Sequence, residues 1–406
     1  MAILKSIKGT TSEVMAEQVA GNIGIETSVT ITDDSYTADN LLDIISDTSK
    51  TITLTSTAAW TPIVAEAADL VTILTRVNKY TGPLTAADPT TGTLDPATTV
   101  EQLNYIAKKT TGKVTAELAA ATPISKATVD ALKDVNSSDI ITFKPAPATT
   151  VSGKSDLEAL VALDKKLSDA DWTNVATFNG AANEVNAIKA AIKVVPAADV
   201  TITSGQISAA DANALVVASK GDVIATIKDG SVAATLNALK DVADDVAGTN
   251  TLTFKSTDKT ADANALVKLA ALVTEDFSSV QTITSKAADI GTNGANVTNA
   301  LALPTVAGAA VTITGAISAA DAGAISTATN GKVTATITPD TAFNIAGALT
   351  ALVAKDALAV TVNGDTASVA NLKTIDAKAL KVKVDAAEVT ADTFAEFESI
   401  YVTGKA

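Results

Sequence analysis

The chain has 406 residues, 45 acidic against 30 basic side chains, a net charge of −15, and neither Cys nor His. Without Cys and His, the sequence excludes disulfide bonds, cysteine nucleophiles, Ser-His-Asp triads and imidazole metal ligands. The acidic charge, with Arg76 as the single arginine, disfavours nucleic acid and anionic membranes as partners, because both are themselves negatively charged.

Apolar residues make up 47% of the chain and aromatic residues only 3%, which favours thin, regular layers over large irregular cores. The recurrence of Ala, Thr, Val and Asp indicates internal repetition. No stretch approaches about 18 consecutive apolar residues, so no membrane insertion is expected. The N-terminal segment "MAILKSIKGTTSEVMAEQVAGNIG" lacks the apolar centre of a secretory signal. A location outside the cell would therefore require leaderless secretion, release by lysis or a leader that has been removed.

Short β-branched runs with period-2 alternation recur along the whole chain and predict strands. There are sixteen, roughly 20 to 35 residues apart: "AILKSI" near Ile3, "VTIT" at Val29, "TITLT" at Thr51, a weak one near Tyr80, "KVTAEL" at Lys113, "IITFK" at Ile140, "NVATF" at Asn174, "VTIT" at Val200, "VIATI" at Val223, "TLTFK" at Thr251, "VQTIT" at Val280, "VTIT" at Val311, "VTATI" at Val333, "AVTV" at Ala359, "LKVKV" at Leu380 and "SIYVT" at Ser399.

Short amphipathic segments with helical spacing lie between the predicted strands. Examples are "SDLEALVALDKKL" (155–167), "SVAATLNALKDVA" (231–243) and "TADANALVKLAALV" (260–273). In the second, Val232, Leu236 and Leu239 share one face, with polar residues off it. One repeat is therefore strand, turn, short helix and turn.

Such repeats connect parallel strands through crossovers that are normally right-handed. At this short period they predict a right-handed α/β solenoid of leucine-rich-repeat-like build, with about sixteen strand–helix repeats and one long parallel sheet. The consensus Leu and Asn positions of leucine-rich repeats are not visible, so only the architecture is expected to be shared.

The sequence also repeats with a longer period, which spans several of these strand–helix repeats. The segments "GKVTAEL", "GDVIATI" and "GKVTATI" begin at Gly112, Gly221 and Gly331, about 110 residues apart. The segment "LKDVNSSDIITFK" (132–144) likewise matches "LKDVADDVAGTNTLTFK" (239–255). These shifts predict four modules, 1–109, 110–219, 220–329 and a shorter 330–406. No linker rich in Pro, Gly or Ser separates them, so one continuous domain over 1–406 is expected.

The clearest copy is "ISAADANALVVASKGDVIATI" (207–227), which matches "ISAADAGAISTATNGKVTATI" (317–337) at 13 of 21 positions. Ser208 and Asp211, like Ser318 and Asp321 in the second copy, resemble a capping box, in which the side chains of a helix start bind its free amides. Ile207 and Ile317 are placed for a staple contact, and Gly221 and Gly331 for a left-handed residue that ends the helix. The motif thus predicts a structural building block.

The alternative interpretation of the motif is a carboxylate pair or calcium site formed by Asp211 and Asp321. The spacing disfavours it, because no dense D-x-D-x-D loop or glycine-rich nonapeptide is present. The turns "GTNGAN" (291–296) and "TNGK" (329–332) lack the full phosphate-loop pattern. Trp60 and Trp172 are isolated in the sequence and indicate no aromatic sugar platform. We therefore expect no enzyme, no cofactor, and no catalytic, cofactor-binding or metal-binding residues.

The strands place aliphatic side chains on one face and threonines on the other. In "VTIT" (200–203), Val200 and Ile202 alternate with Thr201 and Thr203. Threonine is a good strand former that tolerates solvent, so this face requires no ligand. The alternative is a recognition surface for a glycan, for ice or for another copy of the chain. Varying repeat lengths and interruptions such as Ile224 and Lys381 argue against regular ice matching.

The motif "ISAADANAL", followed by Gly-x-Val-x-Ala-Thr-Ile, resembles repeats of surface and virion structural proteins, rich in repeats, of marine cyanobacteria and their phages. The resemblance covers most of the chain from about Thr98 onward. The resemblance implies an extracellular or virion structural role without catalytic residues. The leading hypothesis is a structural protein that assembles end to end with copies of itself as a filament, surface layer or appendage. The alternative hypothesis is an adhesin or receptor-binding module that binds a surface glycan.

Overall fold

The computed structural model describes residues 3–55, 60–78, 80–242, 249–306, 308–350, 356–390, 393–396 and 398. The chain divides into two compact bodies. The first comprises residues 1–205 and 218–222, and the second comprises 206–217 and 223–406. The single domain over 1–406 and its four modules stay predictions. The predicted strand "SIYVT" at Ser399 lies outside the described residues.

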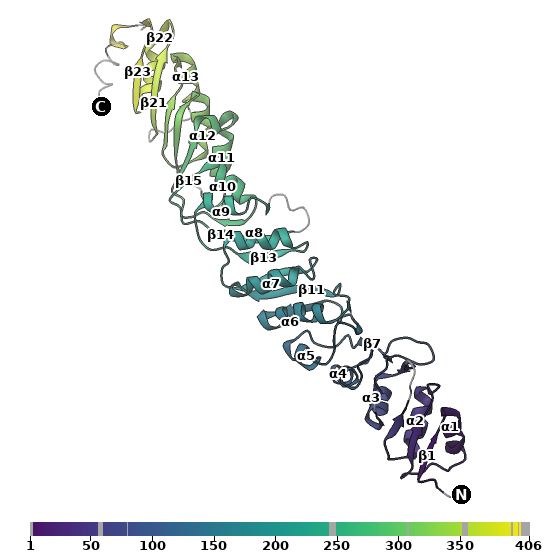
Figure 1. Cartoon of the computed structure of the whole chain (residues 1–406). Helices are drawn as coiled ribbons and strands as arrows, with labels where there is room; N and C mark the ends of the chain where they lie inside the picture. Colours follow the sequence, from purple (N-terminus) through teal and green to yellow (C-terminus); the bar gives the residue numbers. More distant parts are fainter. Residues whose placement is uncertain are drawn as a thin grey trace. The chain divides into compact units, whose positions relative to one another are not determined.

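The first body alternates strands and helices along the sequence (Figure 1). Its elements are β1 (Ser6–Gly9), α1 (Thr11–Val19), β2 (Ser28–Ile31), α2 (Ala38–Asp47), β3 (Ile52–Leu54), β4 (Ile63–Ala65), α3 (Ala67–Arg76), β5 (Val77–Asn78), β6 (Leu84–Ala86), α4 (Val100–Lys109), β7 (Val114–Leu118), α5 (Lys126–Ala131), β8 (Ile140–Phe143), β9 (Thr149–Ser152), α6 (Gly153–Lys166), β10 (Asp169–Ala170), β11 (Val175–Ala181), the 3-10 helix η1 (Ala182–Glu184), α7 (Val185–Ile192) and β12 (Asp199–Ser204).

The second body continues the alternation. Its elements are α8 (Ala209–Ala218), β13 (Val223–Thr226), α9 (Val232–Ala238), β14 (Thr251–Lys255), β15 (Thr260–Asp262), α10 (Ala263–Ala270), β16 (Thr274–Asp276), β17 (Thr282–Lys286), the 3-10 helices η3 (Ala287–Asp289) and η4 (Thr292–Gly294), α11 (Ala295–Leu301), β18 (Ala310–Ile317), α12 (Ala319–Ala328), β19 (Val333–Ile337), β20 (Asp340–Thr341), α13 (Ala342–Ala348), β21 (Ala357–Asn363), β22 (Thr366–Ser368), α14 (Val369–Asp376), β23 (Lys381–Val384) and β24 (Glu388–Thr390).

The class is α/β, and the pairs formed by these strands are parallel, as the strand–helix alternation predicts. In the first body the strand orders are β1-β2-β3-β5, β4-β6-β7-β8-β10 and β9-β11-β12. In the second body they are β13-β14-β16, β15-β17-β18-β19-β21-β20 with β23 on β21, and β22-β24. Within each body the strands therefore belong to several sheets, where one long sheet was predicted.

The sheets change where a repeat carries two short strands instead of one, an arrangement that we call a joint. At the first joint, β3 and β5 end one sheet, and β4 and β6 begin the next. At the second joint, the pair β8 and β10 ends one sheet, and the pair β9 and β11 begins the next. At the third joint, β14 and β16 end one sheet, and β15 and β17 begin the next. Strands β21 to β24 repeat this split. The single strand predicted near Tyr80 is in fact the pair β5 and β6 on either side of it.

The aliphatic side chains of the strands pack against the helices, and the alternation has the predicted phase. Val200 and Ile202 of β12 are buried, whereas Thr201 is half-buried and Thr203 is exposed. Figure 1 shows α6 and α7 side by side in the first body, and these helices contact each other. Each buried Val, Ile or Leu contributes about 1.5–3 kcal/mol to stability, so the regular stripe of aliphatic residues supplies most of the core.

Two helix predictions are corrected in detail. Helix α9 buries Thr235 and leaves Leu236 half-buried. At 3.6 residues per turn, Thr235 and the buried Leu239 lie on one side of Val232 around the helix axis, whereas Leu236 lies on the other side. The segment predicted as a helix from Thr260 begins as β15, and α10 starts only at Ala263. The side chain of Asp262 accepts the Ala265 amide at 3.0 Å and caps this helix.

Candidate functional surfaces

The repeated motif is a structural building block in both copies. Ser208 Oγ accepts the Asp211 amide at 3.0 Å and donates to its carboxylate at 2.7 Å. Ser318 and Asp321 repeat both contacts at 3.0 and 2.6 Å. Ile207 is buried, as a staple residue should be. The carboxylates that the alternative interpretation assigned to calcium are thus bound to the serines of their own helix caps.

The role predicted for Gly221 and Gly331 is wrong. Neither residue has a positive φ. A Cβ atom at Gly221 would lie 2.7 Å from the carbonyl carbon and oxygen of Ala198, and one at Gly331 would lie 2.2 Å from the Ala309 oxygen. Gly112 is equally close to the Gly82 backbone. Glycine is required because two successive backbones touch there, whereas the left-handed conformation is not used.

A ladder of hydroxyl groups connects the ends of helices α4, α8 and α12 to the preceding repeat. Thr110, Ser219 and Thr329 donate to the carbonyls of Gly82, Ala198 and Ala309 at 2.6, 3.0 and 2.7 Å. Each also accepts the amide of the glycine two residues later. Sequence reasoning missed these residues, although the spacing Thr/Ser-x-Gly about 110 residues apart carried the signal.

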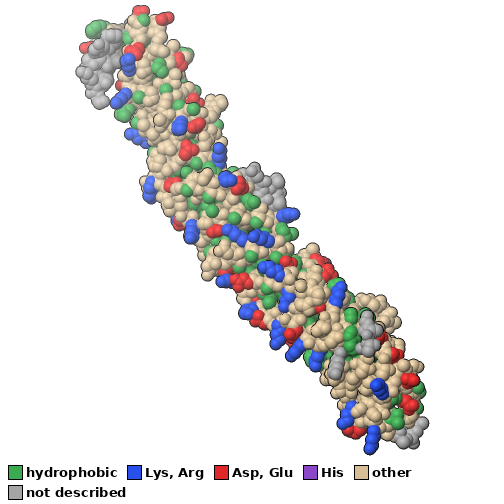
Figure 2. Space-filling view, viewed as in Figure 1, with side chains coloured by type: hydrophobic (Ala, Val, Ile, Leu, Met, Phe, Trp, Pro, Cys, Tyr) green, Lys and Arg blue, Asp and Glu red, His purple; other side chains and the backbone are tan. Residues whose placement is uncertain are grey.

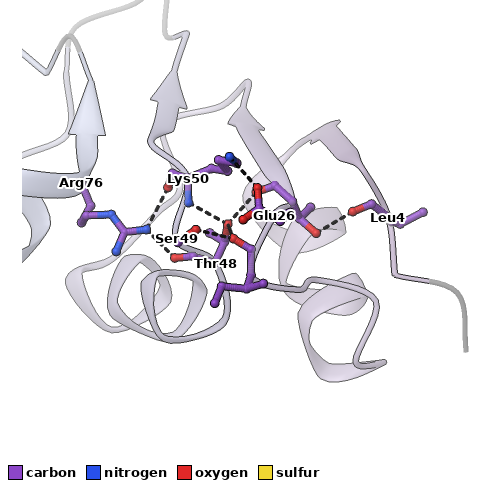
Figure 3. A network of polar contacts seen from close by, with 8 residues as sticks. Leu4, Glu26, Thr48, Ser49, Lys50 and Arg76 are labelled. Carbon is purple, nitrogen blue, oxygen red and sulfur yellow. Dashed lines mark hydrogen bonds and ion pairs between the residues drawn. The ribbon is translucent and has the colours of Figure 1, made fainter.

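Arg76 completes the same ladder near the N-terminus (Figure 3). Thr27 donates to the Leu4 carbonyl at 2.6 Å, and Thr48 donates to the Thr27 carbonyl at 2.7 Å. The guanidinium of Arg76 then donates to the carbonyls of Thr48 and Lys50. Because Thr48 ends helix α2, the positive charge also lies at the negative end of the helix dipole. The single arginine of the chain therefore has a structural contact.

The threonine face is solvent-accessible and forms ladders across neighbouring strands of the second body. Thr284, Thr312 and Thr334 are register partners on β17, β18 and β19. Parallel strands place such side chains about 4.8 Å apart. Ile224 and Lys381, the predicted interruptions, are exposed. Figure 2 shows acidic and basic side chains interspersed on the visible face of each body.

A second ladder of Thr226, Thr253 and Thr274 lines a shallow groove of about 370 Å³ in the second body. Thr253 donates to Thr226 at 3.0 Å between the hydroxyl oxygens. The groove is lined by Gln206, Thr226, Asp229, Thr253, Phe254, Lys255, Thr274, Glu275 and Asp276. Gln206 donates to Asp229 at 3.0 Å. The arrangement offers hydroxyl, amide and carboxylate groups to a polar ligand.

The edge strand β1 leaves apolar side chains open to solvent. It pairs only with β2 among the described residues. Val29 and Ile31 of β2 are fully buried, whereas Ile7 of β1 is only half-buried. Ile3 and Ile25 are 56% and 68% exposed. A Cβ atom at Gly24 would lie 2.6 Å from Ile3, so Ile3 packs on Gly24, the residue before Ile25. This end strand therefore lacks the outer layer that inner strands have.

The tryptophans have ring partners that the sequence did not indicate. Trp60 lies 5.1 Å from Tyr80 and Trp172 lies 5.5 Å from Phe143, both centroid to centroid and edge to face. A cavity of about 670 Å³ lies beside Trp172. Its carboxylates are already occupied: Asp164 accepts the Trp172 indole N–H, and Asp199 accepts the Asp222 amide. Trp172 is itself buried, so it offers no flat ring to a sugar.

The titratable groups with shifted pKa values reflect local packing. Burial raises the pKa of Tyr36 to about 12, with smaller contributions from Asp34 and Asp33. The Lys144 ammonium, together with Thr173, holds the pKa of Asp171 well below its usual range. Over the described ranges, no group of three or more acidic residues is arranged to hold a metal ion. No helix within those ranges is long and apolar enough to cross a bilayer.

The comparisons with known proteins add no relative. No protein-family model matches the chain, and no curated protein matches it either.

Proposed function

We propose that this chain is a non-enzymatic structural protein that associates with copies of itself in an extracellular or virion assembly. Its parallel strand–helix repeats would be the turns of a right-handed α/β solenoid of about sixteen repeats. Association end to end would build a filament, surface layer or appendage. Leaderless secretion or incorporation into a virion would bring it there, in line with its resemblance to cyanobacterial surface and phage structural proteins.

The observation that carries this proposal is the edge strand β1, which pairs on one side only among the described residues. An edge strand offers unpaired backbone groups to another strand. Here the edge is accompanied by Ile3, Ile7 and Ile25, whose side chains are incompletely covered. Burial of this surface by a second copy would stabilise the contact through the hydrophobic effect. Lys8 on β1 is exposed, and edge lysines oppose indiscriminate association.

The second body supplies further support at its last described strands. Leu380, the residue before β23, and Val384, the last residue of β23, are 67% and 41% exposed. Val382 between them is half-buried. Strand β23 pairs with β21 alone among the described strands. Both bodies thus present an edge strand with apolar side chains in solvent, as end-to-end association requires.

The test is the assembly state of the full chain, followed by light scattering and negative-stain electron microscopy over a range of concentrations, salt and calcium. The variant Ile3→Lys/Ile25→Lys should assemble at least tenfold less readily than the unmodified chain. Val217→Lys is the matched control, because Val217 is also largely exposed but lies on α8. A monodisperse monomer under every condition would rule out self-assembly.

The second candidate is an adhesin, and the groove at Thr226, Thr253 and Thr274 favours it. Its polar lining suits the hydroxyl groups of a surface glycan. Thr226→Lys should abolish binding of the full chain to a glycan array. Thr334→Lys, on the same threonine face but outside the groove, should leave binding intact. Equal binding by both variants, or none by the unmodified chain, would remove this candidate.

A further inference from the structure

The sequence contains four Asn-Gly dipeptides, which begin at Asn179, Asn293, Asn330 and Asn363. In this dipeptide the backbone nitrogen of glycine can attack the side-chain amide of asparagine, because glycine has no Cβ atom to hinder the approach. The two groups belong to one chain, so their orientation sets the rate. The attacking nitrogen must be free of a hydrogen bond, and the chain must be able to rotate at the dipeptide. The four dipeptides differ in both respects.

Two of the dipeptides are fixed by the packing of successive repeats. Gly180 is buried within β11, where it is the register partner of Ile202 on β12. The amide of Gly331 donates to the Thr329 hydroxyl at 2.8 Å, and a Cβ atom at this glycine would lie 2.2 Å from the Ala309 oxygen. Neither glycine can turn toward the preceding asparagine unless two repeats move apart.

The dipeptide at Asn293 is fixed by a compact turn. The Gly294 amide donates to the Gly291 carbonyl at 3.2 Å, and Gly294 is buried. Asn293 and Gly294 both have positive φ values, 54° and 67°. A Cβ atom at Gly294 would lie 2.7 Å from the Ile325 side chain. Rotation at this dipeptide would therefore break the turn and its contact with helix α12.

The dipeptide at Asn363 is open to solvent. Asn363 is the last residue of β21, Gly364 follows it before β22, and both residues are exposed. Among the described residues the Gly364 amide has no hydrogen-bond acceptor. The Gly364 carbonyl accepts the Ala387 amide at 3.1 Å, but this carbonyl belongs to the next peptide unit. The glycine nitrogen is therefore available to the asparagine side chain, and water reaches both.

We infer that Asn363 is a site of spontaneous deamidation through a succinimide. The Gly364 nitrogen bonds to Cγ of Asn363, and the bond between Cγ and the side-chain nitrogen breaks. The proton of the Gly364 amide leaves with that nitrogen as ammonia. Solvent water then opens the succinimide at either of its carbonyls, which gives aspartate or isoaspartate. The product adds a negative charge next to Asp365, and isoaspartate also lengthens the backbone between β21 and β22. This modification does not depend on self-association.

Peptide mass spectrometry of the full chain, incubated at neutral pH, measures conversion at the four asparagines in one sample. Asn363 should convert about tenfold faster than the other three, or more, because reaction at those sites must wait for local opening. In the chain unfolded by urea the four rates should become similar, since the dipeptide is the same at each site. Equal rates in the folded chain, or an equal preference for Asn363 in urea, would overturn the inference.

The products and a matched variant test the route. Opening of a succinimide gives isoaspartate together with aspartate, whereas direct hydrolysis of the side chain gives aspartate alone. Fragmentation by electron transfer distinguishes the two products at position 363. Asn363→Gln places the amide one carbon further from the Gly364 nitrogen, so it should abolish conversion of this peptide and leave the other three sites unchanged. Aspartate alone in the unmodified chain, or undiminished conversion of the variant, would overturn the route through the succinimide.

Discussion

The buried carboxylate of Asp139 accepts the backbone amide of Val114, the first residue of β7, at 2.9 Å. The same contact recurs about 110 residues later, where Asn250 accepts the Val223 amide at 2.9 Å. It recurs again where Asp356 accepts the Val333 amide at 2.9 Å. A side chain of one repeat thus satisfies the first amide of the preceding strand. Buried amides require such a partner.

Replacement of Asp139 by alanine should destabilise the first body by about 2–3 kcal/mol. The substitution leaves the Val114 amide unpaired, as well as the Asn136 amide, which the same carboxylate accepts at 2.9 Å. Asp139→Asn should cost less, because Asn250 shows that an amide oxygen serves Val223 equally well. Urea unfolding followed by hydrogen exchange checks both variants. An unchanged stability of Asp139→Ala would show that the Val114 amide finds another partner.

Alanine at the close-contact glycines should be destabilising by about 2–3 kcal/mol. At Gly221 and Gly331 the new Cβ would overlap the backbone of the preceding repeat at 2.7 and 2.2 Å, so two repeats must move apart. Gly347→Ala is the control, because no atom lies within 4 Å of its Cβ position. That change should stabilise α13 by about 0.5–1 kcal/mol. Thermal unfolding measures the melting temperature of the three variants, and it should be lower for Gly221→Ala and Gly331→Ala than for Gly347→Ala. A similar melting temperature for all three would contradict the steric explanation.

Two aspartates at corresponding joints should respond differently to loss of their lysine. The largest cause of the low pKa of Asp171 is Lys144, so Lys144→Ala should raise that pKa strongly. The hydrogen bonds from Ser278 are the largest cause at Asp276, so Lys255→Ala should leave its pKa low. Carboxyl carbon NMR titration measures both values. A large rise at Asp276 would show that the ion pair dominates there too.

The sign of the pH dependence follows from the lowered pKa values. Both aspartates have folded-state pKa values below the usual value of about 3.9. Their contribution to stability is therefore complete above that pH and is lost as the pH falls toward the folded-state pKa. Lys144→Ala should remove part of this acid sensitivity, and Lys255→Ala should change it little. Acid unfolding of the two variants provides the comparison.

Removal of the Tyr36 hydroxyl should stabilise the first body. Tyr36 is 3% exposed, and its hydroxyl has no hydrogen-bond partner in the described part of the chain. A buried hydroxyl without a partner costs about 1–3 kcal/mol, so Tyr36→Phe should raise the melting temperature. The raised pKa of about 12 means that the unmodified chain also loses stability as the pH rises above about 10. A lower melting temperature for Tyr36→Phe would indicate that the hydroxyl is satisfied.

Much of the local structure was predictable from the sequence alone. The alternation of Val200 and Ile202 with threonines gave the strand and its buried face. Ser208 and Ser318 marked helix starts correctly, since a cap depends on residues within one turn. The parallel α/β class followed from the short strand–helix period. These properties depend on neighbours along the chain, and a sequence pattern reports them directly.

Only the tertiary structure decided how one repeat meets the next. It showed that position 221 requires glycine because a Cβ atom there would overlap the Ala198 backbone. It also showed that the Asp139 carboxylate accepts the Val114 amide, and that the sheet is interrupted where Phe143 meets Trp172. These partners lie 23 to 29 residues apart in the sequence. Hydrophobic periodicity describes the two faces of a single strand or helix. It contains no information on which backbones approach closely, because that distance is set by the packing of whole repeats.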